Sequence, residues 1–313
     1  MACEDQVNIP LDEAEPMVVV DAWLTNTSDT QKINVVYSRP YFDNELPDPV
    51  INAEVSVIEL NENILNEDGS FSSTNIESYI ENFYEFTDSN QDGTYEWIPS
   101  AGSSFGKIGK VYALQVQLEN GNLFESFTQM DSVPVIDSIT FEYNKKNPGF
   151  ESDWYYAEFW SRDLPGTGNT YWIKTFKNHV LYDEPEEINI AYDAGGSAGA
   201  EVDSLIFIQP IRIAINDFGD DAAAASPYIF GDTLKVELHS VSEEAWFFLY
   251  RVIDETSPMP SFAQLFANPL SNVPTNIAAT NNEEQVLGFF NVAAVSSLEV
   301  IMNEDNVVDR VPD

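Results

Sequence analysis

The sequence is poor in cysteine, in positive charge and in long apolar runs. Cys3 is the only cysteine, so no disulfide bond can form within the chain. Thirteen lysines and arginines stand against 53 aspartates and glutamates, which gives a formal net charge of −40 at pH 7. A surface of this sign repels phosphate, so we expect neither nucleic acid nor anionic lipid headgroups as partners. No run of about 18 apolar residues occurs, and we therefore expect no membrane-spanning helix.

Patterns that carry catalysis are also scarce. The two histidines, His179 and His239, form no grouping with each other or with the cysteine that could hold zinc. Residues 102–106 and 195–199 match Gly-x-Ser-x-Gly, but neither stands at a turn from a strand into a helix, where that motif works. Counting 53 carboxylates neither identifies nor excludes an acid and base pair. The sequence predicts that the protein is not an enzyme, and a hydrolase of surface polymers is the least favoured function.

The composition favours folded domains. Hydrophobic residues make up 43% of the chain and aromatic residues 13%, against 21% charged residues, which is ample material for packed cores. A chain of 313 residues exceeds the usual domain of roughly 100–200 residues. We therefore expect two domains, with one large β-domain as the alternative.

The first half alternates apolar and polar residues in short runs separated by turn residues. Leu114, Val116 and Leu118, for example, alternate with Gln115 and Gln117, as a half-buried antiparallel strand requires. The predicted strands are 17–24, 32–38, 53–60, 95–98, 111–119 and 123–130. Apolar residues at helical spacing after Thr74 predict one short helix over 76–84.

The second half begins after a proline-containing boundary at residues 131–134. The predicted strands are 137–143, 155–161, 171–176, 204–215, 233–238, 286–295 and 298–302. Residues 181–203 and 216–232 are rich in Asp, Glu, Gly and Ala and predict exposed loops. Ser240 with Glu243 predicts the cap of a helix near 242–254.

The predicted fold class is all-β, with two β-sandwich (Ig-like) domains, a few short helices and long acidic loops. The predicted organisation is a tether over 1–16, an N-terminal sandwich over 17–132, a C-terminal sandwich over 133–303 and a polar tail over 304–313.

Aromatic residues concentrate after residue 153, and they supply the candidate ligand-binding residues. Alternation places Tyr155 and Phe159 on one face of a strand and Tyr156 and Trp160 on the other. One face belongs to the core. The other is a stacking platform for sugars, a protein interface, or a surface that a helix or loop covers. The candidates are Trp154, Tyr156, Trp160 and Trp172.

One segment resembles the start of a calcium-binding loop. Asp88, Asn90 and Asp92 place oxygen ligands at alternate positions, and Gly93 follows them. The twelfth position, where such loops have a glutamate, is Pro99. A hairpin turn is therefore the main interpretation, a weak Ca²⁺ site is the alternative, and no other cofactor is expected.

The N-terminal segment has the composition of a tether. Glu4 and Asp5 follow Cys3, and a polar, proline-containing stretch continues to Pro16. No basic segment followed by an apolar one precedes it, as a signal peptide would require. We expect Cys3 to be the lipidated residue of a mature lipoprotein, with an incidental free thiol as the alternative.

From Cys3 to Val300 the chain resembles the Bacteroidetes lipoprotein family catalogued as domain-of-unknown-function family 4249, whose members often accompany SusC-type TonB-dependent receptors. The fragments that carry the resemblance are Cys3-Glu-Asp, Glu15–Thr25, Ser38–Phe42, Gly109–Leu114, Val133–Ser138, Gly168–Trp172, Gly231–Leu238 and Leu287–Phe290. Their order along the chain makes the joint match specific. The resemblance supplies no catalytic residues.

The resemblance implies lipidation at Cys3 and a location on the cell surface at the outer membrane. It also implies a role as accessory to a TonB-dependent receptor barrel or another outer-membrane protein. The leading hypothesis is a protein that binds a nutrient, such as a glycan or peptide, or the receptor itself. The alternative is a structural subunit of an outer-membrane or cell-surface assembly with no small-molecule ligand. In either case the lipid anchor is the expected contact with the membrane.

Overall fold

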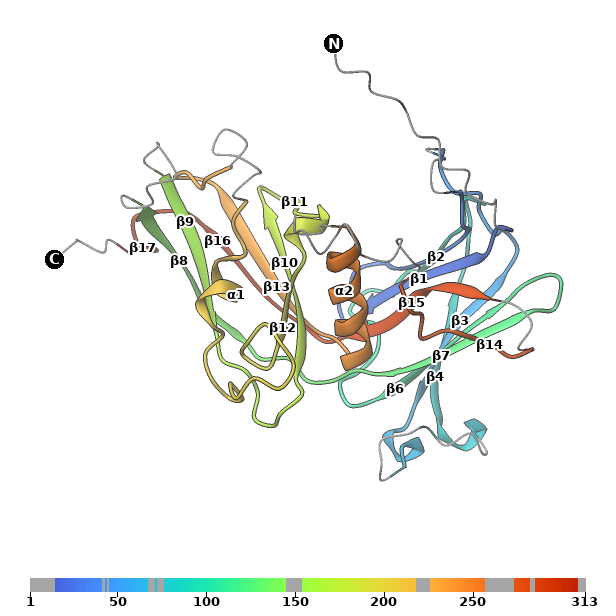
Figure 1. Cartoon of the computed structure of the whole chain (residues 1–313). Coiled ribbons are helices and arrows are strands. Elements are labelled where there is room, and N and C mark those ends of the chain that lie inside the picture. Colours follow the sequence, from blue (N-terminus) through green and yellow to red (C-terminus); the bar gives the residue numbers. More distant parts are fainter. Residues whose placement is uncertain are drawn as a thin grey trace, which may run out of the picture.

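The computed structural model describes residues 15–40, 43, 45–66, 71, 76–144, 154–217, 226–256, 273–281 and 285–308. Cys3 lies outside these residues, as do most of the predicted tether and the last residues of the predicted tail. Figure 1 shows two β-sandwiches side by side, with helix α2 (Glu243–Thr256) between them. The predicted all-β class is confirmed. No helix in the described part of the chain is long and apolar enough to cross a membrane.

The first sandwich consists of two sheets packed face to face. One sheet has the order β15-β1-β2-β5, with bounds Val286–Ala293, Val18–Thr25, Gln31–Tyr37 and Thr94–Trp97. The other has the order β14-β7-β6-β3-β4, with bounds Ala278–Ala279, Leu123–Gln129, Val111–Gln117, Glu54–Leu60 and Ile80–Phe86. Alternation builds the core: in β1, Val18, Val20, Ala22 and Leu24 are buried between the sheets, while Asp21 points outward.

The second sandwich repeats this arrangement. Its larger sheet has the order β11-β10-β13-β16, with bounds Val180–Leu181, Thr170–Lys177, Thr233–Ser240 and Val295–Ile301, and β12 (Asn189–Tyr192) also pairs with β10. Its smaller sheet has the order β17-β8-β9, with bounds Val307–Val308, Ile136–Asn144 and Trp154–Ser161. The short helices are η1 (Glu62–Ile64), η2 (Ile76–Tyr79), η3 (Pro185–Glu187) and α1 (Gln209–Ile213).

The chain returns to the first sandwich near its C-terminal end. Strand β15 pairs in parallel with β1, from Val18 opposite Val286 to Thr25 opposite Ala293. Its Phe290 is fully buried in the first core. The sequence-based division placed 133–303 in one domain, whereas β14 and β15 belong to the sheets of the first sandwich. Pairing between strands so far apart in the sequence leaves no local pattern that could predict it.

A single residue separates β15 in the first sandwich from β16 in the second. That residue, Ala294, is fully buried. It is held on both sides by Ser240, whose backbone N–H donates to the Ala294 carbonyl (2.9 Å) and whose Oγ accepts from the Ala294 N–H (3.2 Å). Asn26 adds bonds to the flanking residues Ala293 and Val295. The connection between the two sandwiches at Ala294 is therefore restrained by hydrogen bonds on both sides.

Two asparagine side chains each hydrogen-bond to both backbone groups of a residue at a strand edge, as a neighbouring strand would. Asn216 accepts from the Ala157 N–H (2.6 Å) and donates to the Ala157 carbonyl (2.8 Å), at the edge of β9. Asn276 does the same with Phe290 of β15, at 2.9 and 2.8 Å. Each pair satisfies backbone groups that an open edge would offer to another chain.

The predicted helix over 76–84 is wrong. Only Ile76–Tyr79 are helical, as η2, and the chain continues as strand β4. Tyr84 and Phe86 are buried and the residues beside them are exposed, which is a period of two. Pairing with β3 over six residue pairs outweighed the helical spacing.

The predicted strand over 204–215 is also wrong. This segment makes one isolated bridge, from Ile206 to Arg162, and then forms α1. Phe207, Ile211 and Ile215 are buried at intervals of four residues, the spacing of a helix face. Pro210 stands in the first turn of α1, where its missing N–H is not needed.

Two further predictions need correction. Residues 181–203 are not simply an exposed loop, because β12 lies within them and Ile190, Ala191 and Ala194 are buried. Helix α2 forms as predicted, but Ser242 rather than Ser240 caps it, with its Oγ accepting from the Ala245 N–H (3.1 Å). Ser240 is the last residue of β13 and pairs with β10.

We predict that Gly288→Ala destabilises the protein by about 3 kcal/mol or more. Gly288 lies opposite Val20 in the β1–β15 pair and has a φ of +95°. A Cβ there would lie 2.0 Å from the Val20 carbonyl oxygen, so the clash adds to the cost of roughly 1–2 kcal/mol of a left-handed conformation. Denaturant unfolding measures the change.

Gly121→Ala is the matched control. Gly121 has a φ of +91°, but nothing lies within 4 Å of a Cβ built on it. This variant should be destabilised by only about 1 kcal/mol, the cost of the left-handed backbone conformation for alanine. Equal losses in the two variants would show that the close approach of β15 to β1 does not constrain the fold.

Candidate functional site

The outer face of the β8–β9 pair carries the first candidate site. Cross-strand pairing sets Ser138 beside Trp160, Thr140 beside Glu158 and Glu142 beside Tyr156. The residues between them face the second core, where Ile139, Phe141 and Phe159 are buried. The strand period therefore gathers polar and aromatic side chains on the side away from the core.

Trp160 is held in place from two sides. Its Nε1 donates to Thr140 Oγ1 (2.9 Å), and the Arg212 guanidinium lies over its ring at 4.3 Å from the centroid. Arg212 comes from α1 and also binds the buried Glu158, with Nε and Nη2 at 2.8 and 2.6 Å from Oε1. A buried carboxylate with a guanidinium partner and a ring that cannot swing freely make this face pre-organised.

These side chains surround a trough of about 240 Å³, lined by Ser138, Thr140, Glu142, Glu158, Trp160 and Val308. Most of its polar groups are oxygen acceptors. The Glu142 carboxylate already accepts from the Tyr156 hydroxyl (2.8 Å), and Glu158 is paired with Arg212. Lone pairs that remain on these oxygens suit a ligand with several hydroxyl or amine donors.

The four aromatic candidates do not form one surface. Tyr156 and Trp160 lie together on the outer face of β9, as the alternation predicts. Trp154 begins β9, and its side chain lies outside the described residues. Trp172 lies elsewhere, at the junction between the sandwiches, where it meets Trp23 at 5.2 Å between ring centroids.

The junction is a cluster of rings around α2. Trp23 stacks on Phe289 (5.6 Å), and Phe248 of α2 packs against Phe289 (4.7 Å). Trp246 and Leu249 of the same helix are buried there. This packing is what the apolar stripe of α2 predicts.

Beside Trp172, a charged group on β13 is strongly perturbed. Burial raises the pKa of Glu237, but hydrogen bonds and charge from His239 and Lys235 outweigh burial and bring it to about 2. The distances to these partners are 3.0 Å for His239 Nε2 and 2.6 Å for Lys235 Nζ. Burial lowers the pKa of His239. Glu237 therefore stays ionised at neutral pH, with a partner at each of its two oxygens.

The Asp88 segment forms a turn. Asp88 accepts from the backbone N–H groups of Asp92 (3.2 Å) and Gly93 (2.9 Å), and Asp92 accepts from Thr94 (3.0 Å). Asn90 is exposed. Within the described ranges, no three His, Cys, Asp or Glu side chains are grouped so that they could hold a metal ion.

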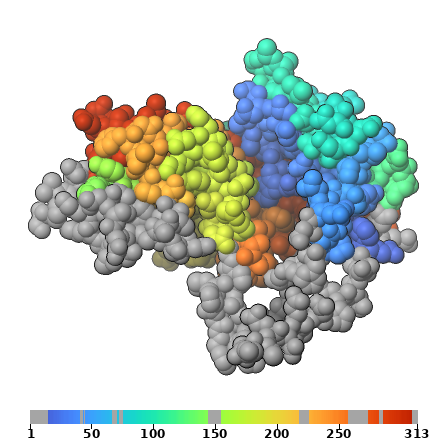
Figure 2. Space-filling view, turned by 90° about the horizontal axis from the view of Figure 1, so that it is seen from above, coloured from blue at the N-terminus to red at the C-terminus, as the bar shows by residue number. Residues whose placement is uncertain are grey.

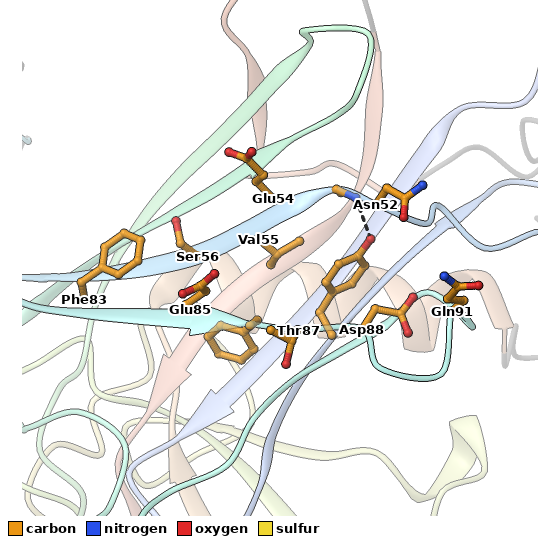
Figure 3. Close-up of a pocket in the computed structure, with 12 residues that line it drawn as sticks. Asn52, Glu54, Val55, Ser56, Phe83, Glu85, Thr87, Asp88 and Gln91 are labelled. Atoms are coloured by element: carbon orange, nitrogen blue, oxygen red, sulfur yellow. Dashed lines mark hydrogen bonds between the residues drawn. The ribbon is translucent and has the colours of Figure 1, made fainter.

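Asp88 also lies at the rim of a second cleft, of about 470 Å³, at one end of the first sandwich (Figure 3). Glu54, Glu85 and Phe83 come from β3 and β4, while Tyr95 donates from its hydroxyl to the Val50 carbonyl (2.7 Å) and accepts from the Ala53 N–H (2.9 Å). Tyr95 therefore ties the loop before β3 to the sandwich. In Figure 3 the side chains that line this cleft do not converge on one point.

Sequence reasoning found Tyr156 and Trp160 but missed their partners. Thr140 and Glu142 reach the site through the β8–β9 register, and a pairing of the two predicted strands could have identified them. Arg212 comes from a segment that was predicted as a strand, so its position over Trp160 could not be foreseen.

The fold and the trough define a two-sandwich, all-β protein with an acceptor-rich surface site. A family model described as "Domain of unknown function (DUF4249)" matches residues 4–299, and the chain belongs to this family. The predicted family is confirmed. No curated protein matches the chain.

Several solved structures match as well. One, titled "Crystal structure of tetra-tandem repeat in extending region of large adhesion protein", is 11% identical, with 90% of this chain and 49% of that chain covered. The chain thus spans about half the length of that structure. The TM-score of 0.19 is too low for the likeness to carry an argument.

We predict that Glu237 titrates near pH 2 and stabilises the fold at neutral pH. Its folded pKa of about 2 lies below the ordinary 4.5, so the stability it contributes is fully present above pH 4.5. That stability, on the order of 3 kcal/mol, is lost as the pH falls toward 2. Carboxyl ¹³C NMR of Glu237 follows the titration directly.

Lys235→Met should raise the pKa of Glu237, because it removes one of the two partners. Lys32→Met is the matched control, since Lys32 pairs with Glu96 on the first sandwich (2.8 Å). A Glu237 carboxyl that titrates near 4.5 in the wild-type protein would contradict the predicted pairing.

Proposed function

We propose that this protein is a cell-surface lipoprotein of the outer membrane that binds a glycan in the β8–β9 trough and serves a TonB-dependent receptor as an accessory. The proposal assigns no catalytic step to the chain. The observation that supports the proposal is the trough itself. The fixed Trp160 ring and several oxygen acceptors line a concave volume of about 240 Å³.

The chemistry of the trough favours a neutral, hydroxyl-rich ligand over a peptide. Glu142 and Glu158 each have a donor partner, so their full charges are not open to the ligand. The exposed Ser138 hydroxyl can both donate and accept. Sugar hydroxyls match this mixture, and the Trp160 ring, which is half-buried and lines the trough, offers an apolar surface for a sugar's C–H groups.

The proposed membrane attachment and receptor partner are supported by the family resemblance and by the net charge of the chain. Lipidation at Cys3 would supply the membrane contact, since a net charge of −40 opposes direct binding to anionic headgroups. A buried acyl chain contributes about 0.8 kcal/mol per methylene, which the chain's own acidic surface cannot replace. A receptor barrel at the membrane would then receive the ligand from the accessory.

We predict that Glu142→Gln and Ser138→Ala each weaken glycan binding at least about tenfold. Each variant removes an acceptor or a hydroxyl from the trough while leaving Trp160, Arg212 and Glu158 untouched. Calorimetric titration with a panel of neutral oligosaccharides measures the change.

Glu119→Gln is the matched control, because Glu119 is exposed in the turn between β6 and β7 of the first sandwich. Its binding should equal that of the wild-type protein. If no oligosaccharide of the panel binds, or if all variants bind equally well, the trough is not the binding site.

We predict that the full-length lipidated protein, purified from its native membrane under mild extraction, brings a TonB-dependent barrel with it. Mass spectrometry of the purified material identifies the partner. A Cys3→Ser variant, which lacks the lipid attachment, should leave the membrane fraction. Recovery of a surface assembly without a barrel, together with no ligand, would instead support the structural alternative.

A further inference from the structure

Strand β4 forms an edge of the first sandwich. It pairs with β3 on one side and stands last in the order β14-β7-β6-β3-β4. Tyr84 and Phe86 are buried in the first core, so Phe83 and Glu85, which alternate with them, point to the outer face of the sheet. Figure 2 shows the turquoise part of the chain, to which β4 belongs, at the surface of the first sandwich.

The backbone on the other side of β4 is open at Glu85. Two residues later, the N–H and carbonyl of Thr87 exchange hydrogen bonds with Glu96, both at 3.0 Å, on the side away from β3. Backbone groups of alternate residues point to the same side of a strand, so those of Glu85 also point away from β3. In the described part of the chain, no group meets them there.

Other strand edges are met by side chains of the same chain. Asn216 bonds to both backbone groups of a residue at the edge of β9, and Asn276 does so at the edge of β15. At β4, among the residues that the structure describes, a side chain meets one such group: Asn82 accepts from the Phe83 N–H (2.9 Å). An edge with unpaired backbone groups is a place where an extended segment can add as a strand.

The cleft of about 470 Å³ lies along this edge. Phe83, Glu85 and Thr87 of β4 line it, with Glu54 and Ser56 of β3 beside them (Figure 3). The Phe83 side chain is 56% exposed. Because the lining side chains follow two strands and do not converge on one point, the cleft suits an extended ligand better than a compact one.

The unpaired charges of the cleft are negative. Glu54 and Glu85 are exposed, and no cation of the described residues lies within 4 Å of either. A Lys or Arg side chain on an added strand would therefore gain a cross-strand partner at Glu85. The cations of the first sandwich have other partners: Lys32 pairs with Glu96, Lys107 with Glu59, Lys110 with Glu62 and Glu81, and Arg39 with Asp43, Glu45 and Asp48.

A second copy of this chain fits the edge poorly. It brings the same net charge of −40. An antiparallel pair of two β4 strands centred on Phe83 would set Glu85 of one copy opposite Glu81 of the other. Like charges directly opposite each other destabilise a strand pair, so the charge of the edge favours a basic partner.

We propose that the outer edge of β4 binds an extended, basic segment of a partner protein, which adds to the sheet as one more strand. Its backbone pairs with Glu85 as Glu96 pairs with Thr87. An apolar side chain packs on Phe83, and a Lys or Arg side chain enters the cleft beside Glu85. The site is independent of the β8–β9 trough, which belongs to the second sandwich.

The test is calorimetric titration of the full chain with a peptide of seven residues, the length of β4. The peptide acetyl-Thr-Lys-Thr-Val-Thr-Lys-Thr-amide sets a valine between two lysines on one face, and this face reads the same in either chain direction. The result expected is saturable binding, with slower hydrogen exchange of the Glu85 N–H measured by NMR.

Two altered peptides separate charge from strand pairing. A peptide with glutamate in place of both lysines should bind at least about tenfold more weakly, because it sets like charges together. A peptide methylated at the valine nitrogen lacks the N–H that an antiparallel strand donates to the Phe83 carbonyl. It should also bind at least about tenfold more weakly.

Two variants locate the site. Glu85→Lys and Phe83→Ser should each weaken binding of the lysine peptide at least about tenfold. Glu119→Lys, in the exposed turn between β6 and β7, is the matched charge reversal and should bind as the wild-type protein does. Circular dichroism checks that the variants fold. If Phe83→Ser does not, Glu85→Lys and the peptide series decide.

Three results would overturn the proposal: no saturable binding of the lysine peptide, equal binding of the methylated peptide, or equal binding by Glu85→Lys. Sedimentation of the free chain gives a further check, since a dimer that Phe83→Ser dissociates would assign the edge to a second copy instead. Glu85→Lys should leave oligosaccharide binding unchanged, so failure of the edge can be told apart from failure of the trough.

Discussion

The parallel pairing of β1 with β15 is the constraint on which the rest of the structure depends. It joins residues near the two ends of the chain, from Val18 to Ala293, and so encloses everything between them. Because Ala294 alone separates β15 from β16, the same pairing also positions the second sandwich. Ser240 holds that step through both hydrogen-bonding groups of Ala294. The sandwiches are therefore coupled by backbone as well as by the ring cluster around α2.

Some of the scarce cations organise buried carboxylates. Arg212 binds the buried Glu158, and Lys107 reaches the fully buried Glu59, which also accepts from the Tyr84 hydroxyl (2.6 Å). A carboxylate removed from water is costly unless it has such partners. The chain has 13 cationic and 53 acidic residues, so most of its carboxylates have no cation to pair with.

The strands of the first half could be predicted because their apolar residues alternate locally, as in β1. The segment 76–84 could not, because its aromatic residues fit a helix face nearly as well as a strand, and only pairing with β3 decides between them. Strand β15 was predicted, but its partner was not, since a register shared with β1 leaves no trace within either segment. For the same reason, the candidate site could be predicted only in part: Trp160 stood out by its type, while Arg212 reaches it from another element.

The proposed trough site would select its ligand by hydrogen bonding rather than by charge. In the trough, Glu142 and Glu158 are compensated by Tyr156 and Arg212, so the choice of ligand falls to the number and placement of hydrogen-bond donors. Solvent-exposed charges are screened beyond about 8 Å at physiological salt. The acidic exterior therefore repels anions only at short range, and the proposed trough is left to discriminate among ligands that carry no net charge.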